Sequence, residues 1–362
     1  MVAKIGTSSI TDEVGDVDVA AVVKFCDGIA AARAAGHRIV AVTSGAIAAG
    51  LPAVGLGGAA RPTDAVTLQA ASAIGQSRLM RVYDDALAAH GLVSGQLLLA
   101  PLDFGVRQQY LHARGTIDRL LSLGVVPVVN ENDALADDEI RFGDNDRLSA
   151  LVAHLIRADL LVLLTDAAGL LTADPRVDTS ASLIEEIQTF DAELEALAGG
   201  SGTVRGSGGM ASKVQAAKIA SWAGVAAVIA AASRPRVLMD AIEGVAGVGT
   251  SVAPRPERMA ARKLWIAFAV KAAGRVIVDD GARRALEERG VSLLAAGVRA
   301  VDGAFHTGDA VEIAGLDGTV FAKGLVRGDA TEVAAVAGRS SRDLTAGAVS
   351  MVVHRDDLVV VP

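Results

Sequence analysis

Apolar residues along the first two thirds of the chain follow two alternating patterns. In five segments the apolar side chains recur three and four positions apart, which predicts amphipathic helices over residues 18–35, 67–91, 113–124, 146–158 and 211–224. Each helical segment is followed by a short run that is almost entirely apolar, which predicts strands over residues 38–44, 94–100, 125–129, 159–165 and 225–231. Apolar strands separated by helices are typical of a parallel sheet covered on both faces. We therefore expect an α/β fold, with a largely parallel sheet sandwiched by helices.

The pattern changes near residue 250. Segment 250–265 contains two prolines and several cations without periodicity, which is typical of an interdomain linker. Beyond it, short runs of alternating polarity are joined at Asp317-Gly318, a dipeptide that favours a hairpin turn, and residues 279–290 read as a helix. We expect a first domain over residues 1–250, a linker over 251–268, and a small, mainly β second domain over 269–362.

Composition narrows the class of protein. The 362 residues are 51% hydrophobic and 3% aromatic with a net charge of −8, so the chain has no general attraction for nucleic acid. The single cysteine, Cys26, has no internal partner and falls on an apolar helical stripe, so we expect a packed thiol. The six histidines lack the spacing of a zinc site. Without a signal peptide or an apolar run of about 20 residues, we expect a cytoplasmic protein with no membrane span.

Polar residues gather where the predicted strands end. In a parallel α/β sheet, ligands bind beyond the carboxyl ends of the strands. The polar stretches at these ends are residues 4–9 (KIGTSS), 43–46 (TSGA), 130–133 (NEND) and 165–166 (TD). The Asn/Asp clusters NEND and GDND also suit Asx turns or helix caps, and Asp146 would make a good N-cap. The position of two such clusters at strand ends nevertheless favours a ligand site.

A glycine loop at residues 206–210 leads directly into the helix that carries Ser212 and Lys213. Backbone N–H groups at a helix start, together with the helix dipole, favour an anion such as phosphate. A tight turn that needs glycine is the alternative for this loop alone. Neither the G-x-G-x-x-G fingerprint nor the Walker pattern follows a first strand, so the sequence indicates a different nucleotide-binding fold.

Six segments form an ordered set along the chain: VAKIGTSSIT, VTSGAIAAGL, LDFGVRQQYLHARGTIDRLLSLGVVPVVNENDALA, RFGDNDRLSALVA, LLTDAAGLLTADPR and GSGGMASKVQAAKIA. Taken in this order, they resemble the amino-acid kinase family, and in particular its kinases of the glutamate γ-carboxylate. The segment that begins GRVIVDDGARRALEERG resembles a PUA domain. Together these stretches span nearly the whole chain, and their order is far more specific than any one motif.

The resemblance implies roles for individual residues. It places Lys4 and Lys213 on either side of the ATP phosphates, with Asp146 orienting the two ammonium groups. It also implies that ATP is bound by Lys4, Thr165, Asp166, Ser207, Gly208, Gly209, Met210 and Lys213. The amino acid would be contacted by Ser44, Asp133 and Asn145, with Asn130 and Asp144 close by. From charge, we assign Asp133 to the α-ammonium of glutamate, and Ser44 and Asn145 to its carboxylate oxygens.

Elementary chemistry agrees with such a site. A carboxylate with an ordinary pKa of about 4.3 is already ionised at neutral pH, so no general base is needed. Because an anion must approach another anion, catalysis depends on in-line positioning and on cations that offset charge. Lys4 and Lys213 suit this task, although a solvated surface lysine is the alternative reading for each of them alone. Mg²⁺ is expected on charge grounds, without ligands that can be named.

The chain departs from the family pattern at three positions. Leu171 replaces the usual Tyr, Ser212 the usual Thr, and Gly115 an Asn. The first two concern packing on the adenine side, and none removes a charge. The first strand also begins close to residue 1, which suggests that leading residues are missing or that the start is assigned late.

Two other functions are alternatives for this sequence. Kinases of N-acetylglutamate or aspartate would share the sheet and the phosphate loops. An acidic partner for a free α-ammonium disfavours an acetylated substrate, however, and neither kind of kinase resembles this chain over residues 269–362. RNA binding through residues 269–362 is the other class, yet that segment is nearly balanced in charge and lacks clustered aromatics. The resemblance further implies feedback inhibition by proline, homo-oligomers, and a downstream glutamyl phosphate reductase in proline synthesis.

Overall fold

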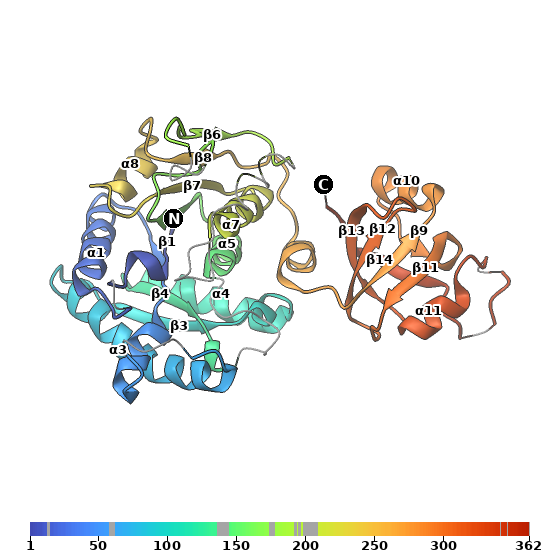
Figure 1. Ribbon diagram of the computed structural model, residues 1–362, viewed down its shortest axis with the longest axis horizontal. Coiled ribbons are helices and arrows are strands. Elements are labelled where there is room, and N and C mark those ends of the chain that lie inside the picture. The colour runs from blue at the N-terminus through green and yellow to red at the C-terminus, as the bar shows by residue number, and fades with distance from the viewer. Residues whose placement is uncertain are drawn as a thin grey trace. The chain divides into compact units, whose positions relative to one another are not determined.

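The structure is a computed structural model of the chain. It describes all residues except 13–14, 58–61, 136–144, 174–177, 192–193, 195–196, 198–208, 341, 346 and 362. The chain divides into two compact units, Met1–Arg258 and Met259–Pro362, each with its own sheet (Figure 1). Among the described residues, no helix combines the length and apolar character needed to cross a membrane.

The first unit is built on an eight-stranded sheet in the order β3-β4-β2-β1-β5-β7-β8-β6. Its strands are β1 Val2–Ile5, β2 Val40–Val42, β3 Ser94–Leu99, β4 Val126–Glu131, β5 Leu160–Thr165, β6 Glu186–Ile187, β7 Ala226–Ala231 and β8 Thr250–Val252. All neighbouring strands pair in parallel except β7 and β8. The prediction of a largely parallel sheet is confirmed.

Helices cover both faces of this sheet. They are α1 Val19–Ala34, α2 Ala46–Gly50, α3 Ala65–Ala88, α4 Arg107–Ser122, α5 Asn145–Leu155, α7 Met210–Trp222 and α8 Val237–Glu243. Buried residues of α1, α3 and α8 share one apolar cluster with Ala3 and Ile5 of β1, whereas α5 and α7 pack against each other beside the opposite face of that strand (Figure 1). The layers are therefore helix, sheet and helix, as the alternation of apolar segments predicted.

Local sequence explains where several helices begin. Asp18 and Asp64 are the N-caps of α1 and α3, and their side chains accept hydrogen bonds from the backbone N–H groups of Ala21 and Thr67. Gly45 precedes α2 with a φ of 92°, in the left-handed region that favours glycine. It turns the chain sharply, so that α2 starts only two residues after Ser44.

The second unit contains a six-stranded sheet in the order β10-β14-β13-β12-β9-β11, with the helices α10 and α11 and the short α9 (Ala261–Leu264) at its start. Its elements are β9 Gly274–Val278, α10 Asp280–Arg289, β10 Leu293–Leu294, β11 Val298–Gly303, β12 Ala310–Ala314, β13 Val320–Val326, α11 Ala330–Val336 and β14 Met351–Val360. The predicted hairpin and α10 are confirmed: β12 and β13 pair antiparallel, with Gly318 at a φ of 80°. Helix α11, which begins with a capping box between Asp329 and Glu332, was not predicted.

The segment expected as an interdomain linker holds short regular elements. Thr250–Val252 forms β8, which pairs with β6 and β7, and Ala261–Leu264 forms the short helix α9, followed by a π-helical turn at Trp265–Ala269. A strand of three residues and a helix of four are too short to show a period in the sequence.

Candidate active site

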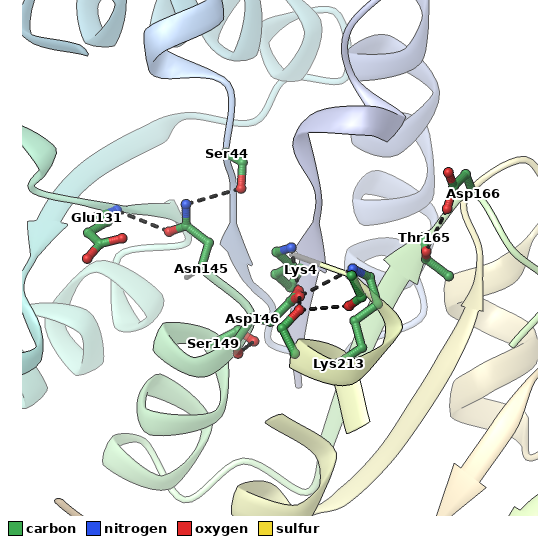
Figure 2. A network of polar contacts seen from close by, with 11 residues as sticks. Lys4, Ser44, Glu131, Asn145, Asp146, Ser149, Thr165, Asp166 and Lys213 are labelled. Carbon is green, nitrogen blue, oxygen red and sulfur yellow. Dashed lines mark hydrogen bonds and ion pairs between the residues drawn. The ribbon is translucent and has the colours of Figure 1, made fainter. Parts of the chain in front are cut away.

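Three buried charged side chains meet at the carboxyl end of β1. Lys4 comes from β1, Asp146 from the first turn of α5, and Lys213 from the first turn of α7 (Figure 2). The Lys4 ammonium forms an ion pair with Asp146 Oδ1, and Lys213 Nζ lies 3.2 Å from Asp146 Oδ2. Each of the three residues is at most 5% exposed. One carboxylate therefore holds two ammonium groups, one on each oxygen.

The surroundings of Asp146 keep it ionised. Burial alone raises its pKa, but the charges of Lys4 and Lys213 and hydrogen bonds from Lys4 and Ser212 outweigh burial and lower the pKa to about 2. The Ser212 hydroxyl lies 2.6 Å from Asp146 Oδ2 and 2.8 Å from the Gly209 carbonyl oxygen. With the carboxylate ionised, the cluster of Lys4, Asp146 and Lys213 carries one net positive charge, which suits a polyphosphate.

A second set of polar side chains adjoins this cluster. Asn145 directly precedes Asp146 on α5, and its Nδ2 donates to Ser44 Oγ over 3.1 Å (Figure 2). The Glu131 backbone N–H donates to Asn145 Oδ1 over 3.2 Å and to Asn130 Oδ1 over 2.9 Å. All of these residues are buried, although they come from the loop after β2, the end of β4 and the start of α5. Amide and hydroxyl groups thus line one side of the lysine cluster.

Asp133, in the short 3₁₀ turn Asp133–Leu135 after β4, belongs to the same polar set. It is 5% exposed, and its Oδ2 accepts a hydrogen bond of 2.8 Å from Ser72 on α3. A second α3 residue, Gln76, donates to the Glu131 carbonyl oxygen over 3.4 Å. Sequence reasoning missed both Ser72 and Gln76, because each falls at a core-facing position among apolar residues of α3.

The residues predicted to contact the nucleotide lie beside Lys213. Leu163 on β5 is paired with Lys4 on β1, so Thr165 lies two residues and Asp166 three residues beyond that pair (Figure 2). Thr165 is buried, Asp166 is exposed, and the Thr165 hydroxyl donates to Asp166 Oδ1 over 3.0 Å. Gly209 and Met210 form the start of α7, with no side chain capping the helix. The other predicted site residues, Asp144, Ser207 and Gly208, lie outside the described residues.

Metal ligands are few in the part of the chain that the structure describes. No group of three or more His, Cys, Asp or Glu side chains there is arranged to hold an ion. Asp146, the one carboxylate at the centre of the site, is engaged by two lysines. Mg²⁺ usually keeps several waters and binds through phosphates and one or two carboxylates, so it does not need a protein cage.

Comparisons with known proteins show which family the chain belongs to. The profile described as the amino acid kinase family matches residues 1–231, and the PUA domain profile matches residues 274–358. The chain is 45% identical over 361 residues to a glutamate 5-kinase of Nocardia farcinica (strain IFM 10152), covering 100% of this chain and 96% of the relative. It is 43% identical over 364 residues to a glutamate 5-kinase of Pelobacter propionicus, covering 99% of this chain and 97% of the relative.

A solved structure of carbamate kinase from Giardia lamblia bound to AMP-PNP shares 20% identity and aligns with a TM-score of 0.49, covering 70% of this chain and 97% of that one. The two profile matches and the two full-length relatives confirm the resemblance seen in the sequence motifs. The chain therefore belongs to the amino acid kinase family and, within it, to the glutamate 5-kinases that end in a PUA domain.

Proposed function

We propose that the protein transfers the γ-phosphoryl group of ATP to the γ-carboxylate of L-glutamate, giving L-glutamyl 5-phosphate in the first step of proline biosynthesis. Full-length relatives named glutamate 5-kinase support this assignment. The structural observation that carries it is the buried cluster of Lys4, Asp146 and Lys213, placed next to the amide and hydroxyl groups of Asn145 and Ser44.

Lys4 and Lys213 offset the negative charge that builds up as carboxylate and phosphoryl group approach. A unit charge pair 4 Å apart contributes about 4 kcal/mol at an effective dielectric near 20, which corresponds to roughly three decades in rate when it acts in the transition state. Asp146 would hold the two ammonium groups in orientation against their mutual repulsion, because each oxygen engages a different lysine. Preorganised cations of this kind need no rearrangement during the reaction.

The polar set beside the cluster suits glutamate. Asp133 would bind the α-ammonium, while Ser44 and Asn145 would donate to carboxylate oxygens, with Asn130 supporting the strand end. This division follows from charge, because a carboxylate close to ATP would repel the phosphates unless it paired with a cation. Thr165, Asp166, Gly209 and Met210 would contact the nucleotide.

Mg²⁺ would arrive with ATP and supply further charge neutralisation at the phosphates. The chain's own part would be to bind and orient the nucleotide, which the lysine cluster and the backbone N–H groups at the start of α7 can do.

A pair of matched variants on α7 tests the assignment. Lys213→Met should lower turnover about a thousandfold, because it removes a cation from the phosphates. Lys218→Met is the control, since Lys218 is equally buried but lies over the Phe190 ring, 6.0 Å from its centroid. Circular dichroism checks folding of both proteins. Turnover of the Lys213 variant within a few-fold of wild type would rule out the proposed role.

Substrate identity needs a separate experiment. Initial rates with glutamate, aspartate and N-acetylglutamate, each alone and in competition, should show glutamate as the preferred acceptor, since Asp133 favours a free α-ammonium. A higher kcat/KM for either of the other two acceptors would reassign the protein to a related kinase.

Further properties stay predictions. A cytoplasmic location is expected from the sequence, whereas feedback inhibition by proline, a downstream glutamyl phosphate reductase and homo-oligomers are expected from the resemblance. The outermost strand β3 exposes Leu98 by 38%, which supports pairing with another copy at this edge. RNA contact through the PUA domain is the alternative role for that domain, and filter binding of the full chain at low salt tests it.

A further inference from the structure

Helix α3 brings two polar side chains into the interior beside the amino-acid side of the site. Ser72 is 1% exposed and Gln76 is 7% exposed, and they are four positions apart, so they lie on the same face of the helix. Polar groups in an apolar interior are costly unless they make hydrogen bonds. Ser72 hydrogen-bonds to the turn after β4 and Gln76 to the end of β4 and to β3, and the proposed reaction assigns neither of them a role.

Ser72 acts on the residue proposed to bind the ammonium. Its hydroxyl donates to Asp133 Oδ2 over 2.8 Å, and both residues are buried. A buried carboxylate that accepts a hydrogen bond has a restricted orientation, and bonds to a charged acceptor are stronger than neutral ones. The bond joins residues 61 positions apart, so it links α3 to the turn after β4.

Gln76 forms hydrogen bonds with the end of strand β4. Its Oε1 accepts from Gln96 Nε2 over 2.8 Å and from Asn130 Nδ2 over 3.4 Å, while its Nε2 donates to the Glu131 carbonyl oxygen over 3.4 Å. The side-chain amide thus connects β3 to the last two residues of β4. Asp133 follows only two residues later, so the position of that strand end sets where its carboxylate lies.

Close packing fixes α3 against α2, the helix that follows Ser44. A Cβ on Gly75 would lie 1.7 Å from the Ala46 carbonyl oxygen, and one on Gly50 would lie 1.8 Å from the Ala71 carbonyl oxygen. Helices α2 and α3 therefore touch backbone to backbone. Because α2 begins directly after Ser44-Gly45 and Ser72 lies on α3, this contact leaves Ser44 and Ser72 little freedom to move apart.

We infer that Ser72 and Gln76 are positioning residues that set affinity and selectivity for the amino-acid substrate, with Ser72 orienting Asp133 toward the α-ammonium and Gln76 holding the strand end that carries it. The inference rests on the proposed function, and in particular on the role of Asp133. Neither residue touches the reacting atoms, so their effect falls on binding of glutamate rather than on the chemical step.

The test compares Ser72→Ala with Ser77→Ala. Ser77 is on the same helix, but it is exposed and donates only to the Ile74 carbonyl oxygen, so its loss should change nothing. Alanine is a better helix former than serine, so Ser72→Ala should fold. We expect KM for glutamate to rise about tenfold or more, with kcat and KM for ATP within about twofold of wild type. Discrimination against glutarate, which lacks the ammonium, should fall by a similar factor.

A double-mutant cycle separates orientation of Asp133 from general damage. In an Asp133→Ala background, Ser72→Ala should add nothing to KM for glutamate, because the group it orients is gone. A second readout needs no turnover: glutamate should raise the thermal midpoint of the Ser72 variant less than that of wild type, while ATP should raise both equally. Gln76→Met provides an independent variant and should also raise KM for glutamate selectively.

The outcomes are distinct. If Ser72→Ala leaves KM for glutamate within twofold of wild type while Asp133→Ala raises it, the inference fails and the proposed site stands. It fails as well if Ser72→Ala weakens ATP and glutamate equally, or if its effect multiplies fully with that of Asp133→Ala. If Asp133→Ala itself leaves KM for glutamate unchanged, the proposed assignment of the ammonium site fails, and this inference fails with it.

Discussion

Replacing Asp146 with asparagine should damage stability and turnover together. The amide has nearly the same shape as the carboxylate but removes its charge, and its NH₂ group would face an ammonium. At the 3.2 Å separation from Lys213 Nζ, one ion pair corresponds to about 5 kcal/mol at an effective dielectric near 20. Burial opposes this attraction, yet the net balance still lowers the pKa of Asp146 from 3.8 to about 2, equivalent to about 2 kcal/mol in favour of the charged form.

The variant would also leave Lys4 and Lys213 buried without their shared carboxylate. Removing one partner of a buried ion pair typically costs about 3–5 kcal/mol, so we expect the unfolding free energy at pH 7 to fall by about that amount. Turnover should fall about a thousandfold, because the two ammonium groups would repel each other and no longer be held in place. Asp118→Asn is the control, since Asp118 is 52% exposed and pairs with Arg114 only at the surface.

The pH dependence gives the prediction a definite sign. Because the folded-state pKa of Asp146 lies below its ordinary value, its stabilisation is complete above about pH 4 and is lost as the pH falls toward 2. The stability difference between wild type and Asp146→Asn, measured by urea unfolding followed by circular dichroism, should be constant from about pH 5 to 8 and shrink below about pH 4. Equal stability at pH 7, or a difference that grows on acidification, would refute the electrostatic reasoning.

Three further results are expected. Asp133→Ala should raise KM for glutamate at least tenfold more than KM for ATP in initial-rate measurements, whereas an equal rise in both would contradict the assignment. Gly75→Ala should lower the thermal midpoint, because its Cβ would lie 1.7 Å from the Ala46 carbonyl oxygen, while Gly115→Ala, with nothing within 4 Å of its Cβ, should leave the midpoint unchanged or raise it. Chelation by EDTA should abolish turnover until Mg²⁺ is restored without shifting the thermal midpoint; a clear shift would indicate a structural metal.

The sheet of the first unit could be predicted because its inner strands are buried on both faces. The apolar run 159–165 corresponds to β5, whose residues from Leu161 to Thr165 are all buried. Short elements escaped prediction for a physical reason. Helix α2 has five residues and β8 has three, so neither spans enough positions to show a period, and the antiparallel pairing of β8 with β7 depends on tertiary contacts.

The residue types of the site could be predicted from local sequence, but their closeness in space could not. Lys4 and Lys213 are 209 positions apart, and only the strand order, which places β1 next to β5 and β5 next to β7, brings both to the same edge. The family resemblance supplied that information. Ser72 and Gln76 could not be found in this way, because at helical spacing among apolar residues they read as ordinary positions of a packed helix face.

Strand β1 shows why stability and catalysis depend on the same few residues here. Ala3 and Ile5 pack into the apolar cluster with α1, while Lys4 between them faces the other side and meets Asp146. A shift of one residue in the pairing of β1 with β5 would bury the ammonium among apolar side chains and expel Ile5. The pairing register of β1 with β5 therefore also determines which face of the sheet Lys4 points from. Asp146 offsets the cost of burying the Lys4 ammonium, so its loss should lower both the stability of the fold and the turnover rate.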